Sequence, residues 1–519
     1  MSASTEKKLR QAARKAGTDK KTLALEKEAK EKARQKRRWT LGTVAVCLLI
    51  ALILLLNSNL LFKTTALTVG DENYSASEMS YYYANQYYYW ANQYGSYASL
   101  FGLDTSGGIK GLDSQPCAMA GEGVSWKDYF LENAQTELIQ EKALRDYAAQ
   151  NGIALSQEDL DTVESSFTGM DEYARSQGYA SADKLFAANY GTGVNVNMVR
   201  EAYRNSALAS KALTTYSEAL EYSPAELKEQ YASYNGEKDY FDLAYYYVAA
   251  EKTETAGENG ETTQEVTAQA LAAAEETAKA IRAAYDEAEG EDFAARLDQA
   301  VAGQVADATA NHSTSTQGSG INAAYKDWVM DAARKTGDIT VTADSSDSGY
   351  YVVVFIGREN NDYKLAQVRH ILVKAEADAD GNYTEEAKAA AKARAEEILA
   401  EYEAGEKTED SFAALAEQYS EDGGSNTNGG LYDSVVKGQM VAEFNDFCFA
   451  NHKPGDTAIV YGESGSYAGY HVMYYVGQGD NYAQTIARND LVNQAVSQWL
   501  SELTAAYTAT PGFGMRLVG

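Results

Sequence analysis

The chain has 519 residues, of which 45% are hydrophobic, enough for ordinary cores in roughly three domains. Its formal net charge of −30 is uneven, because residues 1–40 carry 14 basic and 5 acidic side chains and the remaining residues carry 31 basic and 70 acidic ones. So acidic a body lacks the basic patches that nucleic-acid phosphates require, which excludes a nucleic-acid partner. Three cysteines are too few for a disulfide scaffold, and with Cys47 in an apolar run at most one bridge is possible.

The basic head, residues 1–38, is followed by an apolar run at residues 39–62, WTLGTVAVCLLIALILLLNSNLLF, which contains no charged side chain. A helix needs about 20 such residues to cross a membrane. The positive-inside rule predicts an N-terminus in the cytoplasm and a body outside it. A cleaved signal peptide is the alternative, but the long head and the lack of a small-x-small site favour an uncleaved signal anchor. We therefore expect a single-pass protein of the cell membrane, with the membrane as a partner through residues 39–62.

Residues 64–222 are expected to form a mainly helical lobe. The stretch from Ser75 to Glu78 has the form of a capping box and precedes an aromatic-rich helix at residues 80–94. Aromatic side chains at helical spacing indicate either a core helix or a groove that binds client polypeptides. The Gly- and Ser-rich stretch at residues 95–123 is expected to be a long loop.

From residue 223 onward the chain repeats itself. Three pairs of residues lie 119 positions apart, namely Phe293 and Phe412, Ile321 and Met440, and Tyr325 and Phe444. Each copy is expected to run strand, long helix, short helix, loop, helix and strands, an α+β module with helices on an antiparallel sheet. The modules span residues 223–360 and 361–480, and a C-terminal helix at residues 481–519 is expected to pack on the lobe. The acidic stretch 251–261 of the first copy is expected to be a loop.

Six motifs of the second copy follow in the order of one family. They are VRHILV (Val368–Val373), FAALA (Phe412–Ala416), SED (Ser420–Asp422), Gly429-Gly430, GQMVAEF (Gly438–Phe444) and GYHV (Gly469–Val472). On these motifs the segment 364–477 resembles a parvulin-type peptidyl-prolyl cis-trans isomerase. The layout of the whole chain resembles the extracytoplasmic foldases of the PrsA and SurA type, in which a helical chaperone lobe built from both ends of the chain accompanies parvulin modules.

The chemistry that this resemblance implies is rotation about an X-Pro bond. Amide resonance gives that rotation a barrier of about 18–20 kcal/mol. No bond is made or broken, so the site needs no metal or cofactor, only a better fit to the twisted amide than to the planar one. The catalytic residues that the resemblance implies are His370, Asp422 and His471, and the residues of its proline slot are Met440, Phe444 and Tyr432.

Met440 and Phe444 are four apart on a predicted helix, so both are expected to face one way. We expect Phe444 to be partly exposed until substrate binds, and we assign Phe447 and Phe449 to the core. Tyr432 stands where the family has Leu, and it is expected to narrow the slot.

The family's Ser or Thr near His471 has no clear counterpart, and Ser466 is the candidate. The first copy has Tyr245 and Tyr351 where the second has its two histidines, and Gly303 in place of Asp422. The first module is therefore predicted to be degenerate, folding like the second without catalysing.

The resulting hypothesis is a peptidyl-prolyl isomerase and chaperone that assists the folding of exported proteins at the outer face of the membrane. Its partners would be unfolded or newly exported polypeptides that contain X-Pro bonds. The alternative is a non-catalytic holdase that binds secreted polypeptides, and a structural surface protein is the third class considered. An isomerisation assay with a proline peptide distinguishes the enzyme from the other two.

Overall fold

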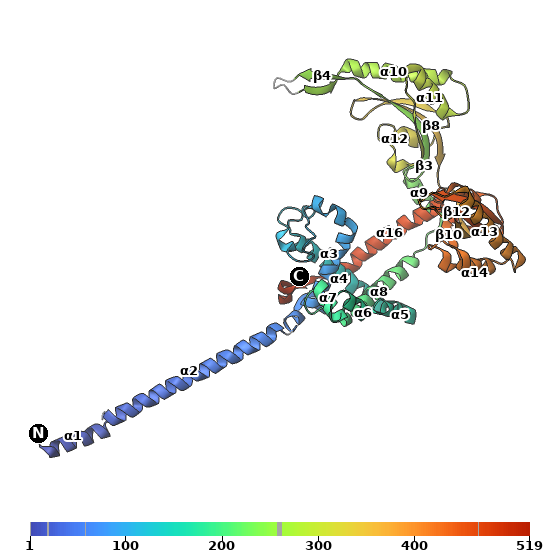
Figure 1. Cartoon of the computed structure of the whole chain (residues 1–519). Helices are drawn as coiled ribbons and strands as arrows, with labels where there is room; N and C mark the ends of the chain where they lie inside the picture. The colour runs from blue at the N-terminus through green and yellow to red at the C-terminus, as the bar shows by residue number, and fades with distance from the viewer. Residues whose placement is uncertain (1, 18–19, 58, 257–261, 466) are drawn as a thin grey trace. The chain divides into compact units, whose positions relative to one another are not determined.

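The computed structural model describes all residues except 1, 18–19, 58, 257–261 and 466. Its described residues form two compact units, one of residues 1–220 together with 495–519, and one of residues 221–494. Both units combine helices with antiparallel sheets (Figure 1). The mixed helix and sheet architecture of the expected α+β class is therefore present. Cys47, Cys117 and Cys448 are free thiols, so the one possible bridge is not formed.

The first unit is mainly helical. Its helices and 3₁₀ turns are α1 (Ala3–Lys15), α2 (Lys20–Asn57), η1 (Leu61–Lys63), α3 (Ala76–Tyr94), η2 (Gly95–Phe101), η3 (Leu112–Ser114), α4 (Trp126–Gln150), α5 (Gln157–Ser165), α6 (Met170–Ser176), α7 (Ala182–Tyr190), α8 (Val196–Glu218), the end of α16 (Tyr482–Thr504) and η6 (Phe513–Leu517). Its sheet has the order β13-β1-β2, formed by β13 (Ala509–Pro511), β1 (Thr65–Val69) and β2 (Glu72–Ser75). Strands from near both ends of the chain thus pair in one sheet.

Local sequence signals explain where α3 begins. The Ser75 hydroxyl accepts a hydrogen bond from the backbone N–H of Glu78, and the Glu78 carboxylate accepts one from the backbone N–H of Ser75 at 2.7 Å, which confirms the capping box. Most aromatic side chains of α3 are buried, Tyr83 completely. Near the other end of the chain, Trp499 of α16 stacks on Tyr216 of α8 with ring centroids 3.8 Å apart. Aromatic packing therefore forms much of this unit's core.

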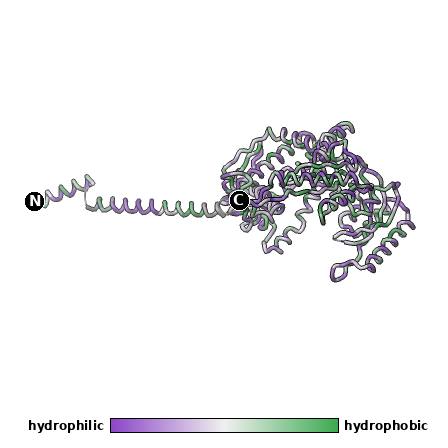
Figure 2. The backbone as a smooth tube through the Cα atoms, turned by 90° about the horizontal axis from the view of Figure 1, so that it is seen from above, coloured by the Kyte–Doolittle hydropathy of each residue, from purple (hydrophilic) through white to green (hydrophobic). Residues whose placement is uncertain are grey.

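The predicted transmembrane anchor needs correction. α2 contains most of the apolar run, and it changes from hydrophilic to hydrophobic along its length (Figure 2). Among the residues that the structure describes, however, no helix is long and apolar enough to cross a membrane. Of this run, Ser58 lies outside the described residues, and so do the side chains of residues 51–57. This contradicts the transmembrane segment at residues 39–62 and the single-pass cell-membrane location with its assigned orientation. Association with the membrane through these residues is not shown.

The second unit holds two modules in series after α9 (Pro224–Ser233), which begins with a Ser223 cap and with Pro224 as its first residue. The first module consists of β3 (Tyr240–Ala249), β4 (Lys252–Ala256), β5 (Thr262–Val266), α10 (Ala268–Glu287), α11 (Phe293–Gln304), β6 (Asn311–Gln317), η4 (Gly318–Gly320), α12 (Lys326–Met330), β7 (Ile339–Ala343) and β8 (Gly349–Glu359). The second consists of β9 (Lys364–Lys374), α13 (Glu385–Ala404), α14 (Glu409–Tyr419), η5 (Asn426–Asn428), β10 (Leu431–Val435), α15 (Ala442–Phe449), β11 (Thr457–Ser464) and β12 (Tyr467–Asn481).

The two four-stranded sheets have equivalent strand orders, β6-β3-β8-β7 and β10-β9-β12-β11. Each loop expected between the short helices contains an additional edge strand, β6 or β10. The acidic stretch expected to be a loop in the first copy instead begins a β-hairpin, in which β4 pairs antiparallel with β5. Of that stretch, residues 257–261 lie outside the described residues. Thr and Glu alternate in the first strand of the hairpin, and Thr favours strand conformation. The acidic composition of the stretch had indicated a loop instead.

The central strands of the second module bury both faces. Ile371 of β9 and Val472 of β12 pack with α13 and α14 on one face of the sheet. Val368 and Met473 pack with α15 on the other face. Because side chains alternate along a strand, His370 lies on the same face as Val368. The sheet therefore presents both of its histidines toward α15.

Candidate active site

Two neighbouring strands bring the predicted histidines together. In the register of β9 and β12, His370 pairs with Met473 and His471 pairs with Leu372, so the histidines occupy diagonal positions. Their Nδ1 atoms are 2.9 Å apart, and both residues are buried, at 3% and 4% exposure. The structure thus joins two residues that are 101 positions apart in the sequence by one hydrogen bond between buried side chains.

The turn after α14 brings Asp422 to the same point. Its Oδ2 lies 2.9 Å from Nε2 of His370. The Ser425 hydroxyl donates to Oδ2 at 2.6 Å, and the backbone N–H of Gly424 donates to Oδ1 at 3.1 Å. The Tyr432 hydroxyl donates to Oδ2 at 3.0 Å from β10. Four partners therefore hold a carboxylate whose side chain still keeps 21% of its surface exposed.

The geometry orients the protons of this network. An ionised carboxylate only accepts hydrogen bonds, so the Nε2–H of His370 donates to Asp422. The two Nδ1 atoms of His370 and His471 share one hydrogen bond, in which the nitrogen that carries the proton donates to the other. Nε2 of His471 forms a further hydrogen bond with the Tyr467 hydroxyl, 3.0 Å away. The result is a continuous chain of hydrogen bonds from Tyr467 through both histidines to Asp422.

The same contacts shift the ionisation of the network. The hydrogen bond from His370 holds the pKa of Asp422 well below its usual range, against the opposing effect of burial. Burial lowers the pKa of His471 to about 3, and the neighbouring His370 adds to that shift. Burial raises the pKa of Tyr432 to about 12, and the charge of Asp422 adds to it. Near neutral pH the site therefore holds an ionised Asp422, a neutral His471 and a protonated Tyr432 hydroxyl.

Phe444 forms the apolar cover of this network. Its ring centroid lies 5.3 Å from that of His370 and 5.2 Å from that of His471, in edge-to-face geometry. Only 2% of Phe444 is exposed, so the expectation of a partly open side chain was wrong. Phe447 is buried as expected, whereas Phe449 is only partly buried. Phe444 is a core residue that also contacts the candidate catalytic groups.

Met440 does not share a helix with Phe444, as had been expected. α15 begins at Ala442 with Val441 as its N-cap in an extended conformation, so Met440 lies before the helix. It nevertheless packs, partly exposed, against the apolar cluster that contains Phe444. Tyr432 is also partly exposed, with its ring 5.2 Å from His370. All six predicted site residues therefore lie around one cluster, and those partly open to solvent are Asp422, Tyr432 and Met440.

Sequence reasoning missed two polar members of the network. Ser425 is 1% exposed and contacts both His370 and Asp422. The feature of the sequence that could have identified Ser425 is its position three residues after Asp422 in a Gly-rich turn. Tyr467 stands four residues before His471, an even spacing that puts both on one face of β12. The earlier candidate Ser466 lies outside the described residues.

The conformation of Gly430 explains why a glycine stands at this position of the turn. Its φ of +72° is in the left-handed region, and a Cβ there would lie 2.2 Å from the backbone oxygen of His370. Its own carbonyl accepts from the backbone N–H of His370 at 2.9 Å, and its N–H donates to the carbonyl of Ser425 at 2.8 Å. The glycine thus ties the turn of Asp422 directly to the strand of His370.

The described residues contain no group of three or more His, Cys, Asp or Glu side chains arranged to hold a metal ion. The network can position charge and hydrogen-bond donors, but it presents no activated nucleophile. Its serine and tyrosine hydroxyls form hydrogen bonds with a carboxylate or with a histidine. This arrangement suits a reaction that needs electrostatic positioning without covalent attack.

Comparison with known proteins identifies the domain that carries the network. Residues 350–474 match the family model described as the PPIC-type PPIase domain. This part of the chain is a PPIC-type peptidyl-prolyl isomerase domain. The match begins in β8 of the first module and includes every residue of the network, and the resemblance to the parvulin type agrees with it.

The proteins that this chain is similar to include one named as a chaperone and others named PrsA. The chaperone SurA of Pseudomonas fluorescens (strain Pf0-1) is 28% identical over 185 residues, which are 32% of this chain and 38% of that protein. PrsA from Bacillus subtilis is 15% identical with a TM-score of 0.29, over 74% of this chain and 88% of that one. Foldase protein PrsA from Streptococcus pneumoniae is 11% identical with a TM-score of 0.24, over 74% and 91% of the two chains. The chain thus spans well under half the length of the SurA that it matches.

Proposed function

We propose that this protein is a peptidyl-prolyl cis-trans isomerase of the parvulin type and a folding chaperone for unfolded polypeptides that contain X-Pro bonds. The observation that carries the proposal is the chain of hydrogen bonds from Tyr467 to Asp422, covered by Phe444 in a PPIC-type domain. His370, Asp422 and His471 are its proposed catalytic network. Met440, Tyr432 and the edge of the Phe444 cluster are the proposed contacts of the proline ring.

The proposed mechanism acts on the charge distribution of the amide. A planar amide places negative charge on its oxygen and positive charge on its nitrogen, and rotation to the twisted form removes that separation. An ionised Asp422 that faces the carbonyl disfavours the planar form and leaves the twisted form less affected. The buried partners of Asp422 keep it ionised and fixed in orientation, so it needs little reorganisation during rotation. Apolar surfaces from Met440 and Phe444 exclude water, which would otherwise stabilise the planar form by hydrogen bonding to the carbonyl.

The remaining parts of the chain have proposed roles as well. Residues 64–222, with the C-terminal segment 481–519, serve as the chaperone lobe. Residues 223–360 form a module that folds like the isomerase domain, residues 361–480, but lacks its catalytic network, since Tyr245 and Tyr351 replace the histidines. These roles are supported by the shared strand order of the two modules and by the apolar surface of the lobe described below.

The test is an isomerisation assay on the full chain. Exchange spectroscopy of a short proline peptide should show faster cis-trans interconversion when the protein is present. Asp422→Asn should abolish most of the acceleration while leaving the circular dichroism spectrum unchanged. A chain that suppresses the aggregation of an unfolded client but leaves the exchange rate of the peptide unaltered would instead be a non-catalytic holdase.

A further inference from the structure

The aromatic helix α3 has one face that is not buried in the core of the first unit. Tyr81, Tyr82, Tyr83 and Tyr87 are at most 5% exposed, so the interpretation of this helix as core holds for most of its rings. In contrast, Tyr89 is 67% exposed, among the largest values for aromatic side chains of the described residues. Tyr94 of the same helix is 49% exposed as well. Exposed apolar side chains that gather at one place mark binding surfaces, whereas single ones need no explanation.

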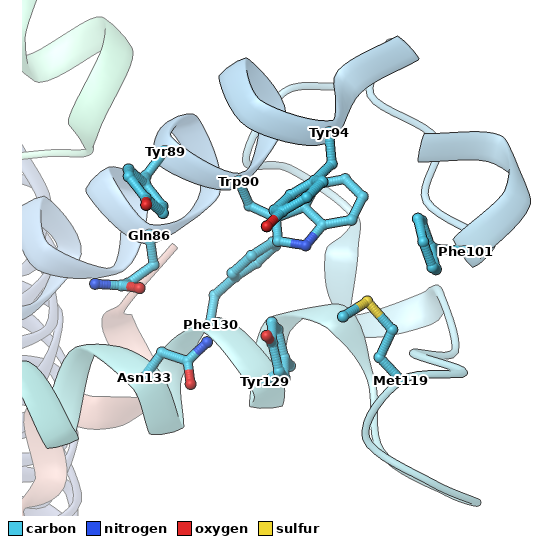
Figure 3. A pocket seen from close by; sticks show the side chains of 9 residues that line it. All are labelled: Gln86, Tyr89, Trp90, Tyr94, Phe101, Met119, Tyr129, Phe130 and Asn133. Atoms are coloured by element: carbon cyan, nitrogen blue, oxygen red, sulfur yellow. The ribbon is translucent and has the colours of Figure 1, made fainter. Parts of the chain in front are cut away.

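The exposed face borders a pocket of about 350 Å³ between α3 and α4. Figure 3 shows side chains from both helices, from η2 and from the following loop around this space. Its apolar lining includes Tyr89, Trp90, Tyr94, Phe101, Met119 and Tyr129. Met119 is 50% exposed and its flexible thioether lies at the rim, as is typical of surfaces that adapt to different ligands. We name this space the aromatic pocket.

Trp90 gives the aromatic pocket an unused hydrogen-bond donor. The residue is 5% exposed and is fixed by Trp126, whose ring centroid lies 4.8 Å away. Its indole Nε1 is buried and has no hydrogen-bond partner. In Figure 3 this nitrogen faces the space between Tyr129, Phe101 and Met119. An indole N–H can only donate a hydrogen bond. Leaving this buried N–H without a partner costs free energy, and an acceptor that enters the pocket would remove that cost.

The chemistry of the lining indicates what that acceptor belongs to. No charged side chain lines the pocket, and its polar groups besides the tyrosine hydroxyls and the indole are the amides of Gln86 and Asn133. Amides donate and accept as a polypeptide backbone does. The volume suits one large apolar side chain with its flanking backbone. The surrounding lobe, residues 64–222, contains 21 acidic and 9 basic side chains, which favours segments that also carry Lys or Arg.

We propose that the aromatic pocket binds an extended segment of an unfolded polypeptide, holding one aromatic or large apolar side chain while a backbone carbonyl accepts from Nε1 of Trp90. The site rests on the proposed chaperone function and assigns part of it to a defined place in the helical lobe. It requires no proline in the bound segment. Binding at the pocket and isomerisation at Asp422 are therefore separable activities of one chain.

The test measures the binding of a fluorescent peptide to the full chain by anisotropy. The probe is an unstructured, proline-free peptide with one Phe between Lys residues. Tyr89→Ala should weaken binding at least tenfold, whereas Tyr97→Ala, which removes a ring that is 57% exposed but does not line the pocket, should leave it unchanged. Replacing the Phe of the peptide by Ser should abolish binding in the unchanged protein.

A second pair of variants tests the donor. Trp90→Phe and Trp126→Phe each remove a buried indole N–H that has no partner, but only Trp90 lines the pocket. Trp90→Phe should weaken binding about fivefold, the scale of one hydrogen bond, beyond any effect of Trp126→Phe. Melting temperatures of both variants show whether each still folds. If Trp90→Phe proves unstable, the pair Tyr89→Ala and Tyr97→Ala alone decides.

Three results would overturn the proposal. They are equal effects of Tyr89→Ala and Tyr97→Ala, equal binding of the Phe and Ser peptides, and sedimentation that shows self-association lost on Tyr89→Ala. The last would make a second copy of the chain the occupant. Isomerisation measured in parallel should be the same in all four variants. A protein that binds the peptide as described but lacks isomerase activity would refute the proposed enzyme while the pocket assignment stands.

Discussion

The two modules of the second unit place the same kind of ring cluster on the same kind of sheet. In the isomerase domain the ring centroids of His370, Phe444 and His471 lie 5.1–5.3 Å apart. In the first module the equivalent rings are three tyrosines, whose centroids lie 5.3–6.3 Å apart, namely Tyr245, Tyr325 and Tyr351. Those tyrosines also border a pocket of about 360 Å³. The aromatic framework is thus common to both modules.

The modules differ in the turn that supplies the carboxylate. α14 ends at Tyr419, which leaves Asp422 free to form a turn with Ser425. α11 continues through Gly303, the position equivalent to Asp422, so the first module has no side-chain carboxylate at that position. Asn311 replaces Gly430 and begins strand β6. Packing therefore preserves the fold in both modules, whereas the hydrogen-bond network depends on a short turn in one of them.

The largest expected effect concerns the shared ring position. Phe444→Ala should destabilise the isomerase domain by about 3–5 kcal/mol, the usual cost of removing a buried Phe. Tyr325→Ala should unfold the first module in the same way, because Tyr325 is 7% exposed. Phe449→Ala should cost less than Phe444→Ala, since Phe449 is partly exposed. Hydrogen exchange of β12 and β8 in the full chain measures each loss separately, and a larger cost for Phe449→Ala would contradict the packing described.

The next effect tests the carboxylate that the first module lacks at the equivalent position. Asp422→Asn should lower the isomerisation rate by about 100-fold, the usual scale for the loss of one preorganised charged group. Asp433→Asn removes an exposed carboxylate from the same domain and is the matched control. Exchange spectroscopy of a proline peptide measures both variants. Equal rates for the two variants would remove Asp422 from the mechanism.

The modules should also respond differently to acid. His471 has its pKa lowered from 6.5 to about 3, so the unfolded chain binds this proton more readily than the folded one. The stability that depends on neutral His471 is complete above pH 6.5 and is lost as the pH falls toward 3. The lowered pKa of Asp422 adds a loss in the same direction below its usual value of 3.8. In the first module Tyr325, whose pKa is raised to about 12, stays protonated throughout this range.

Hydrogen exchange at pH 7 and pH 4.5 tests that difference. Protection of β9 and β12 should fall at the lower pH by more than protection of β3 and β8. His471→Phe should reduce the pH dependence of β12, because it removes the titrating ring. An equal loss of protection in both sheets would show that the acid sensitivity has another source.

The smallest expected effect comes from one hydroxyl. Tyr432→Phe removes a single hydrogen bond to Asp422, while three other donors remain, so the isomerisation rate should fall only about threefold to tenfold. Tyr351→Phe removes a hydroxyl from the first module and should leave the rate unchanged. A Tyr432→Phe variant as inactive as Asp422→Asn would assign the hydroxyl a direct role in binding the carbonyl.

Much of the isomerase domain could be read from the order of its motifs. Side chains alternate between the two faces along the strands of VRHILV and GYHV, which puts each histidine on a defined face. The internal repeat in the sequence also aligns Tyr245 and Tyr351 with the two histidines, and the strand registers agree with that alignment. The capping box that begins at Ser75 marked the start of α3, because capping is a local interaction. Such features depend on neighbours in the sequence or on a pattern repeated along it.

Other features were decided only in three dimensions. The burial of Phe444 depends on two histidines whose strands are far apart in the sequence but adjacent in the sheet. The start of α15 after Met440 depends on the conformation of Val441. The apolar run at residues 39–62 was predicted to be an anchor from its length, its lack of charge and its basic flank, but no described helix is long and apolar enough to cross a membrane. The missing hydrogen-bond partner of Nε1 of Trp90 can be recognised only when the positions of all nearby acceptors are known. Composition and periodicity determine which faces are apolar, whereas burial, ring contacts and unpaired hydrogen-bond groups depend on residues that the chain brings together from far apart.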